Sequence, residues 1–376
     1  MSHRKVIRYS AIAAMVAAAA LVTTGCASSG AQSGTATKGS ESGINVQQAT
    51  KDLAAVVGGP AKIDIPAVGK PIPTGKTINF ITCAVAVCTE VGAGVKAAAQ
   101  TLGWTVKVIP NDSTPAGYQQ AWDQIAQTPG DGVVNSDPVV PYTSITSLLD
   151  KANVPVVSST SPNPVGGHLV AVVAGTAAIK LEGTVDADWV IQDARKPIKS
   201  VFVYDPSIAS LRSALPGYQE AMKKNCPACS TAVLKVSAGQ IGPVLAQQVV
   251  SYLQANPDVK YAAFGLGDLA IGVPAAIKAA GLQDQVKITT RGLDVPNYGD
   301  VQDGGIAAGF TSEAYEAGWR AVDKLAREFA GVSLGDVYPL GVIREVTKST
   351  LPSDLTVPYS IPGYQAAFEK AWGVKS

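Results

Sequence analysis

The sequence predicts an α/β protein with two lobes, each built on a parallel sheet with helices on both faces. Strand-like runs recur along the chain, and most are apolar at nearly every position, as strands buried on both faces of a sheet must be. Segments with helical periodicity alternate with these runs, at roughly 25 to 30 residues per unit. The runs are more numerous than one compact doubly wound domain usually carries, so we expect two lobes.

The N-terminus has the features of an export signal. A basic start, "MSHRKVIR", precedes an apolar run over residues 11–22, and small residues then lead to Cys26. The run is too short to span a bilayer, which takes about 20 residues. The segment resembles bacterial lipoprotein signals, in which the cysteine carries the lipid, although Thr23 stands where that pattern usually has Leu. The resemblance implies a signal over residues 1–26 and an extracytoplasmic protein anchored to the cell membrane at Cys26; a secreted protein with an incidental Cys26 is the alternative.

Length and charge limit the kinds of partner that the chain is expected to bind. With 376 residues, of which 47% are hydrophobic, the chain has enough material for about two domains with real cores. Removal of residues 1–25 leaves 27 of the 30 basic side chains against 29 acidic ones, a net charge of −2. Such a chain lacks the basic surface that nucleic-acid binding requires, so we expect a small or neutral partner.

The elements follow in order from the linker onward. Residues 27–75 are expected to form a linker and a surface extension with one short helix in "INVQQATKDLAAVVGGP", and the folded core to start near residue 76. Strands are expected over residues 77–82, 105–110, 132–136, 154–159, 200–205, 230–236, 261–266, 286–293 and 306–311. Helices are expected over residues 91–102, 116–127, 142–151, 176–193, 211–224, 240–255, 269–280 and 313–330.

A ligand site is expected at the carboxyl ends of these strands, because the loops that follow parallel strands converge on one crevice. The polar residues to consider are therefore those just after each apolar run. These segments are 82–90, 111–112, 136–137, 158–161, 204–207, 267–268, 293–298 and 312–313. Two lobes with facing crevices would form a clamp.

Five blocks of the sequence resemble type I periplasmic binding proteins, in the ribose-like branch that binds sugars for ABC transporters. The blocks are "DGVVNSDPVVPYTSITSLLDKANVPVVSST", "GYQEAMKK", "FGLGDLAIGVPAAIKAAGL", "RGLDVPN" and "QDGGIAAGFTSEAYEAGWRAVDKL". The resemblance implies two Rossmann-like lobes joined by three crossing segments, with a hinge that closes over the ligand and presents the loaded form to a membrane permease. It places lobe 1 at residues 76–172 plus 313–340 and lobe 2 at residues 173–312 plus 341–376.

The resemblance also suggests charged ligand contacts. Arg212 stands five residues before the Gly-Tyr-Gln of its helix, where family members have an arginine that can fork two donors onto hydroxyls; a solvated arginine is the alternative. Asp268 matches the carboxylate of the family's Asn-Asp, and it could equally cap a helix. Asp294 in "GLD" and Asp137 in "NSDP" match polar family positions, and each could instead be a turn aspartate.

Several wall positions depart from the sugar-binding pattern. Thr160 and Ser161 stand where ribose-like members have Asp-Arg, and Ser312, with Glu313 beside it, replaces a glutamine. The first loop, "CAVAVC", has only small and apolar side chains in place of the family's Asn and Phe. We therefore do not expect ribose as the ligand. The candidate ligand-binding residues are Thr89, Glu90, Asp137, Tyr142, Thr160, Asp205, Arg212, Asp268, Asp294, Tyr298, Ser312 and Glu313.

Four cysteines remain besides Cys26, an even number that favours disulfides in an exported protein. Three pairings are possible. We favour Cys83 with Cys88 and Cys226 with Cys229, because a bridge between lobes would lock a clamp that must open. A redox role for the Cys-x-x-Cys pair and a zinc site are the less favoured alternatives.

Catalytic motifs are sparse. The histidines are His3 and His168, no Gly-x-Ser-x-Gly elbow stands near a strand end, and neither a Gly-x-Gly-x-x-Gly nor a P-loop follows the first strand. We predict a protein that is not an enzyme, without cofactor or metal: a monomeric substrate-binding protein of an ABC importer that captures a small hydroxyl-bearing solute, a sugar or sugar-like. The alternatives are a ligand-sensing subunit for a membrane receptor and an exported enzyme or thiol oxidoreductase.

Overall fold

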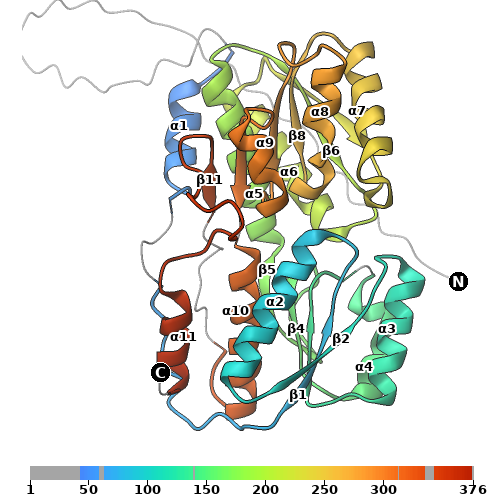
Figure 1. Ribbon diagram of the computed structural model, residues 1–376, viewed down its shortest axis with the longest axis vertical. Coiled ribbons are helices and arrows are strands. Elements are labelled where there is room, and N and C mark those ends of the chain that lie inside the picture. Colours follow the sequence, from blue (N-terminus) through green and yellow to red (C-terminus); the bar gives the residue numbers. More distant parts are fainter. Residues whose placement is uncertain (1–42, 59–62, 139, 312, 335–342, 375–376) are drawn as a thin grey trace, which may run out of the picture. The chain divides into compact units, whose positions relative to one another are not determined.

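The computed structural model describes residues 43–58, 63–138, 140–311, 313–334 and 343–374. Its contacts group residues 40–376 into one compact unit, and the description that follows concerns this unit alone. The unit contains a five-stranded sheet and a six-stranded sheet, which lie in the lower and upper parts of Figure 1. We call the parts built on them lobe 1 and lobe 2.

The sheet of lobe 1 is parallel throughout, with strand order β2-β1-β3-β4-β5. Its strands are β1 (Thr77–Ile81), β2 (Thr105–Ile109), β3 (Gly132–Asn135), β4 (Val156–Ser161) and β5 (Leu169–Gly175). Ile78 of β1 stands opposite Val106 on one side and Gly132 on the other. All four residues of β3 are buried, which explains why this strand is almost continuously apolar.

Helices cover both faces of this sheet. They are α2 (Ala86–Thr101), α3 (Pro115–Gln127), α4 (Thr146–Ala152), which follows the short η1 (Tyr142–Ile145), α10 (Ala314–Ala330) and α11 (Tyr364–Trp372). Helices α3 and α4 pack together, and α2 packs on α10 on the other side (Figure 1). The approach of α2 to α10 requires glycine at position 94, because a Cβ there would lie 1.9 Å from the carbonyl oxygen of Tyr315.

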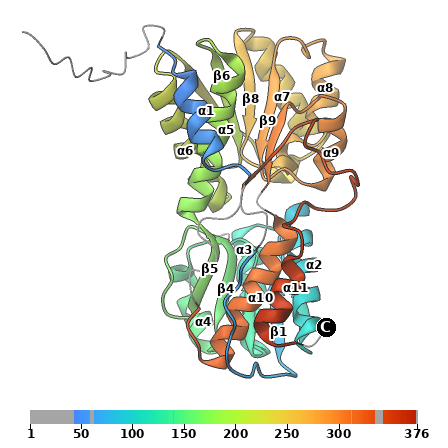
Figure 2. The ribbon, with the colours of Figure 1, turned by 90° about the vertical axis from the view of Figure 1, so that its left-hand side faces the viewer.

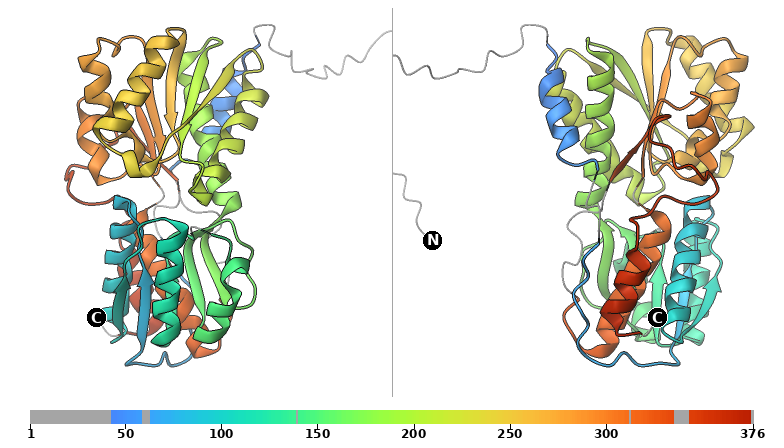
Figure 3. Two further views of the ribbon diagram at one scale, coloured as in Figure 1. Left: turned by 90° about the vertical axis from the view of Figure 1, so that its right-hand side faces the viewer. Right: turned by 60° about the vertical axis from the view of Figure 1, so that its left-hand side comes forward.

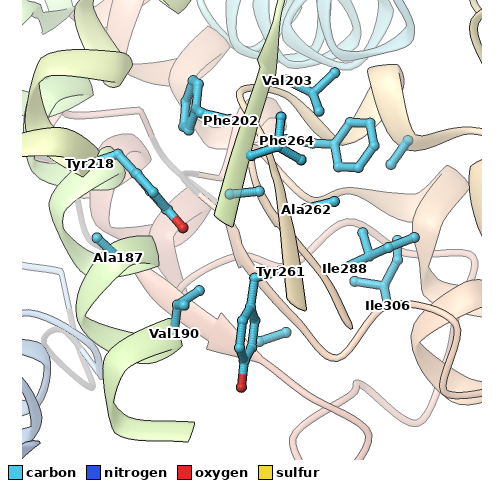
Figure 4. Close-up of a cluster of buried hydrophobic side chains, with 14 of the residues drawn as sticks. Ala187, Val190, Phe202, Val203, Tyr218, Tyr261, Ala262, Phe264, Ile288 and Ile306 are labelled. Carbon is cyan, nitrogen blue, oxygen red and sulfur yellow. The ribbon is translucent and has the colours of Figure 1, made fainter. Parts of the chain in front are cut away.

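The sheet of lobe 2 has the order β11-β10-β9-β8-β6-β7, parallel except for the antiparallel edge strand β11. Its strands are β6 (Lys199–Tyr204), β7 (Ser230–Lys235), β8 (Val259–Phe264), β9 (Lys287–Arg291), β10 (Ala308–Thr311) and β11 (Arg344–Val346). Figure 4 shows part of the core on this sheet, where Phe202, Tyr218 and Phe264 are fully buried. Large apolar side chains on consecutive strands thus supply the hydrophobic stabilisation of lobe 2.

The helices of lobe 2 are α1 (Val46–Ala54), α5 (Thr176–Ala194), α6 (Ala209–Asn225), α7 (Pro243–Ala255), α8 (Val273–Ala279) and α9 (Val295–Gln302). Helices α1, α5 and α6 lie on one side of the sheet and α7, α8 and α9 on the other (Figure 2). Two short 3₁₀ turns, η2 (Ala238–Gln240) and η3 (Gly267–Ala270), follow β7 and β8. Helix α9 begins with a capping box, in which the Asp294 side chain and Asn297 satisfy backbone groups of the first turn.

The two ends of the described chain pack on different lobes. Ala49 and Leu53 of α1 are buried in the core of lobe 2, whereas the following segment contacts lobe 1, where Trp104 Nε1 donates to the carbonyl oxygen of Pro73 (2.7 Å). In Figure 3, the blue segment that leads into β1 runs along lobe 1. Near the C-terminus, Trp372 Nε1 donates to Asp323 Oδ1 of α10 (2.8 Å). Helix α11 therefore belongs to the packing of lobe 1.

This packing bears on the lobe boundaries expected from the sequence, which remain a prediction. The segment 341–376 was assigned to lobe 2; β11 is in the sheet of that lobe, but α11 is not. The difference arises because the apolar face of α11 completes an aromatic cluster in which the Trp319 and Trp372 rings stack 5.5 Å apart.

Among the described helices, none is long and apolar enough to cross a membrane.

The predicted fold class is confirmed, and so are both local disulfides, Cys83–Cys88 and Cys226–Cys229. Each expected strand and helix is present, most with bounds that shift by a few residues. Four elements were not predicted, namely β5, α9, β11 and α11. Residues 1–26, including Cys26, and Ser312 lie outside the described residues.

Candidate ligand-binding site

A cavity of about 100 Å³ lies between the lobes, at the carboxyl ends of their parallel strands. Lobe 1 contributes Cys83 after β1 and Ser136 after β3, and lobe 2 contributes Ser207 after β6 and Leu266 after β8. Loops that follow neighbouring parallel strands converge at one edge of a sheet, which is why ligands bind there in open α/β sheets. The chain therefore places residues from both lobes around one cavity.

Much of the cavity wall is apolar. The apolar side chains are Val85, Val87, Val91, Ile208, Leu211 and Leu266. Val87 and Val91 are four residues apart on α2, so they share one face of that helix. The Cys83–Cys88 disulfide closes the loop that leads into α2 and faces the same cavity. The first loop and first helical turn of lobe 1 thus present small apolar groups to a bound molecule.

Four of the five serine hydroxyls in the described lining already donate to protein acceptors, whereas that of Ser113 accepts from the N–H of Ala84. Ser136 Oγ donates to the carbonyl oxygen of Ile81 (2.8 Å), and Ser159 Oγ donates to that of Ser136 (2.6 Å). Ser210 Oγ, on α6 of lobe 2, donates to Asp137 Oδ2 of lobe 1 (2.6 Å). These hydroxyls can therefore accept hydrogen bonds from a ligand more readily than they can donate.

Asp137 is the main acceptor of the cavity. Its Oδ1 atom is buried and has no hydrogen-bond partner among the described residues. Burial raises the pKa of this carboxyl to about 7, although the Ser210 donor and the charges of Arg291 and Arg212 favour the ionised form. A ligand that donates to Oδ1 would satisfy the unpaired atom.

The cationic side chain of the cavity lining, Arg291, is neutralised by a carboxylate. The Arg291 guanidinium forms an ion pair with Glu182 of α5, with Nη2 2.5 Å and Nε 2.6 Å from the same Oε2 atom. Its Nη1 donates to the carbonyl oxygen of Gly265 (2.7 Å). Both side chains of the pair are buried, so Arg291 brings hydrogen-bonding edges to the cavity with little net charge.

A second region of contact between the lobes is acidic. Asp268 of lobe 2 accepts a hydrogen bond at Oδ1 from the backbone N–H of Ala86, at the start of α2 (3.1 Å). Glu90 of α2 shares a hydrogen bond with the Asp294 carboxyl of lobe 2. Burial, followed by that contact and the nearby charge of Asp268, raises the pKa of Glu90 to about 10. One proton is therefore held between the two carboxyl groups.

The twelve predicted site residues separate into groups. Two line the cavity, Asp137 and Thr160. Three form the acidic contact, Glu90, Asp268 and Asp294. Thr89, on the first turn of α2, is exposed, and Arg212 is exposed with its Nη1 donating to the carbonyl oxygen of Ser207 (3.2 Å). Their roles in ligand binding remain predictions.

The remaining predicted residues serve the surrounding structure. Tyr142 and Tyr298 are buried in the cores of lobes 1 and 2, and their hydroxyls accept from Asn135 Nδ2 and from the N–H of Tyr359. Asp205 accepts from the N–H of Ala238 and from Ser207, and so fixes two loops. No ring from this group reaches the described lining of the cavity, because each tyrosine turns into its own lobe.

Glu313 occupies an unusual position at a crossing between the lobes. It has a φ of 59°, is buried, and lies 3.3 Å from Arg320 Nη2 through its Oε2 atom. Burial and the charge of Glu316 raise the pKa of Glu313 to about 9. The left-handed backbone of a buried glutamate is strained, which fits a segment that changes direction between two lobes.

Sequence reasoning placed the apolar loop 83–88 in the ligand wall, but it missed Arg291 and the rest of the apolar lining, which is Val91, Ile208, Leu211 and Leu266. Val91 follows the same i, i+4 spacing as the core residue Val95, so nothing in the helix pattern distinguishes it. Arg291 was detectable, since it is a charged residue at the carboxyl end of a strand, directly before a glycine. Within the described residues, no group of three or more histidine, cysteine or acidic side chains is arranged to hold a metal ion.

Comparison with known proteins identifies the relatives of this fold. Residues 84–332 match the family described as "Periplasmic binding protein domain". No curated protein matches the chain. A 5-methylthioribose transporter solute-binding protein from Thermotoga lettingae superposes with a TM-score of 0.66 and 17% identity, over 80% of this chain and 94% of that one.

Two further solved structures share the fold. A glucose-galactose binding protein from Geobacillus stearothermophilus has a TM-score of 0.64 and 19% identity, over 74% of this chain and 100% of its own. A periplasmic ribose ABC transporter protein from Conexibacter woesei has a TM-score of 0.59 and 18% identity, over 75% and 95%. At such identities the likeness concerns the fold.

Proposed function

We propose that this chain, which belongs to the periplasmic binding protein domain family, captures a small hydroxyl-bearing solute between its lobes for an ABC importer. The observation that carries the proposal is the cavity lined from both lobes, with a buried acceptor, Asp137 Oδ1, that lacks a partner among the described residues. Buried polar atoms are normally satisfied, and a ligand hydroxyl would satisfy this one.

Lobe closure is the second part of the proposal. Hydrogen bonds that join the lobes include those from Ser210 to Asp137 and from the N–H of Ala86 to Asp268. Both would break if the lobes moved apart, so they favour a closed form that surrounds the ligand. Closure would also create the surface that a permease recognises. The titles of the structural relatives name sugars or sugar derivatives, which supports a sugar-like solute here.

A binding measurement tests this proposal. Thermal unfolding of residues 27–376 is followed with sugars, deoxy sugars, polyols and nucleosides, and any hit is measured by calorimetry. A ligand bound only by the folded form stabilises it by RT ln(1 + [L]/Kd), about 2.7 kcal/mol at a hundredfold excess over Kd. We expect a monomer that becomes more compact in solution scattering with the ligand and returns the ligand chemically unchanged. If no solute shifts the unfolding temperature, or if the ligand is converted, the proposal is wrong.

The location follows from the N-terminal sequence. We propose that residues 1–26 direct export and that Cys26 carries a lipid anchoring the protein at the outer face of the cell membrane, beside its permease. The test is metabolic labelling with an alkyne fatty acid, comparing the natural chain with Cys26→Ser. Label on the natural chain that is lost in the variant supports the anchor, and equal label on both contradicts it.

A further inference from the structure

Resting on the proposed function, we infer that the ligand is an uncharged aliphatic solute with hydroxyls at one end and a methyl- or methylene-rich arm at the other. A deoxy sugar or an alkyl-branched polyol has this chemistry, whereas a fully hydroxylated sugar does not. The inference names the solute class and rests on three features of the described residues: the apolar wall, a second apolar cavity behind it, and the balance of donors and charges.

The apolar wall faces the ligand from both lobes. Val85 and Val87 lie at the start of α2 in lobe 1, and Ile208 and Leu266 face them from lobe 2. A hydroxyl pressed against these side chains would lose its hydrogen bonds to water without replacement. A sugar with hydroxyls all round its ring would place at least one of them there. An alkyl group in the same position gains from leaving water.

A second cavity of about 60 Å³ continues the first toward the crossing between the lobes. The two cavities share Val87, Val91, Ser159 and Thr160. The other side chains of the second cavity are mostly small and apolar. They include Val173, Ala174, Ala178, Ala314, Ala317 and Ile343. Its charged members, Glu182 and Arg320, are held in ion pairs, so the space suits a short alkyl arm.

Aromatic stacking offers no alternative here, since the described lining of both cavities includes no aromatic ring. The charges around the cavity exclude anionic and cationic ligands. A carboxylate or phosphate would meet Asp137, and the Arg291 cation is already paired with Glu182. A cationic ligand would meet the charge of Arg212, which reaches Asp137. A neutral hydroxyl can donate to Asp137 Oδ1 without either penalty.

The test uses pairs of solutes that differ at one group. D-fucose is compared with D-galactose, L-rhamnose with L-mannose, and 2-methylbutane-1,2,3,4-tetrol with erythritol, each by calorimetry on the natural protein. The inference expects at least one alkyl-bearing member to bind about tenfold or more tightly than its hydroxylated or unbranched partner, the discrimination typical of one methyl group in an apolar pocket.

Two variants and one control show where the alkyl group of the ligand binds. Val87→Thr keeps the size of a half-buried side chain that lines both cavities, and it should reduce the preference severalfold. Val244→Thr makes the same change on α7, where the valine is 60% exposed, and should leave the preference unchanged. Ala317→Leu fills the second cavity from α10 and should weaken binding of the alkyl-bearing member more than that of its partner.

The outcomes separate the inference from the proposed function. Binding in which the fully hydroxylated members equal or exceed their alkyl-bearing partners overturns the inference and leaves solute capture standing. A preference that survives both Val87→Thr and Ala317→Leu also overturns it, because the alkyl group then lies elsewhere. Failure of every solute, in the pairs and in the wider thermal screen, overturns both.

Discussion

The lobes meet in two regions that use buried carboxyl groups differently. At the cavity, Asp137 of lobe 1 receives a hydroxyl from Ser210 of lobe 2 and keeps one oxygen unpaired. At the acidic contact, Glu90 of lobe 1 meets another carboxyl, Asp294, with Asp268 nearby. At the cavity, one carboxylate oxygen remains available to a ligand. At the acidic contact, the two carboxyl groups share a proton with each other. The comparison indicates that one region selects the ligand and the other fastens the lobes.

The largest expected effect comes from Asp137→Asn. The amide oxygen can still accept from Ser210, but the ionised acceptor for the ligand is lost. A hydrogen bond to a charged group contributes about 1.5 to 3 kcal/mol, so affinity should fall about tenfold or more. Calorimetry with the solute that binds most tightly measures this loss of affinity. Asp188→Asn, a buried aspartate on α5 that accepts from Asn225, is the control that should leave affinity unchanged. Equal affinities in the natural protein and Asp137→Asn would contradict the assignment.

The two regions should respond to pH in opposite directions. The pKa of Glu90, raised to about 10 by burial and then by Asp294, returns toward its ordinary value when the lobes part. The contact is therefore fully present below the ordinary pKa of a glutamate, about 4.3, and is lost progressively as pH rises from there to about 10. The pKa of Asp137 is about 7, because burial disfavours its charge, so the ionised acceptor is lost as pH falls below that value.

Above pH 7, where Asp137 is ionised, affinity should accordingly fall steadily as the Glu90 contact is lost; below pH 7 the loss of the ionised acceptor opposes the gain at Glu90, so the profile should level off. Calorimetry between pH 5.5 and 9.5 checks this expectation. Glu90→Gln, which keeps a neutral donor, should flatten the alkaline limb and leave a fall below pH 7, whereas Asp137→Asn should let affinity rise further as pH falls. A profile that is flat in the natural protein, or variants that alter the opposite limbs, would refute the division between the two regions.

The two disulfides allow a further comparison between a part of the chain at the cavity and a part away from it. Each closes a short loop, with the cysteines five positions apart at Cys83–Cys88 and three apart at Cys226–Cys229, so removal of either by paired Ser substitution should lower the free energy of unfolding by about 2 kcal/mol. Only the first faces the cavity. Loss of Cys83–Cys88 should weaken ligand binding severalfold, because the free loop must be ordered on capture. The Cys226–Cys229 variant should bind normally; similar losses of affinity in both would remove the distinction.

The sequence predicted the two sheets well because most of their strands are near-continuous apolar runs. Strand β5 escaped notice because its apolar residues, "LVAVVAG", run directly into α5 without a polar break. Helix α9 is only eight residues long and includes Pro296 and Gly299, both poor helix formers. Local pattern identifies long elements and fails where an element is short or continuous with its neighbour.

The site was harder to predict for a different reason. The resemblance directed attention to polar positions, and it found Asp137 and Thr160 in the lining and Asp294 in the acidic contact. The apolar lining depends on which face of α2 meets the other lobe, and that is decided by tertiary packing. Val91 would be an ordinary core residue if the lobes did not meet there.

The smallest expected effect concerns the start of α2. Its N-cap residue, Val85, provides no side-chain hydrogen bond, and Asp268 accepts from the Ala86 N–H across the lobes instead. Loss of a helix cap costs about 1 kcal/mol. Because this cap comes from the other lobe, Asp268→Ala should reduce affinity a few fold by weakening the closed form.

Thr114 supplies the matched control, because its Oγ1 accepts from the Gly117 N–H within lobe 1 and caps α3 there. Thr114→Ala should lower the unfolding temperature by a similar amount and leave ligand affinity unchanged, since both groups move with the same lobe. If Thr114→Ala and Asp268→Ala reduced affinity equally, the acidic region would stabilise the fold in general. The caps would then give no reason to assign lobe closure to that region.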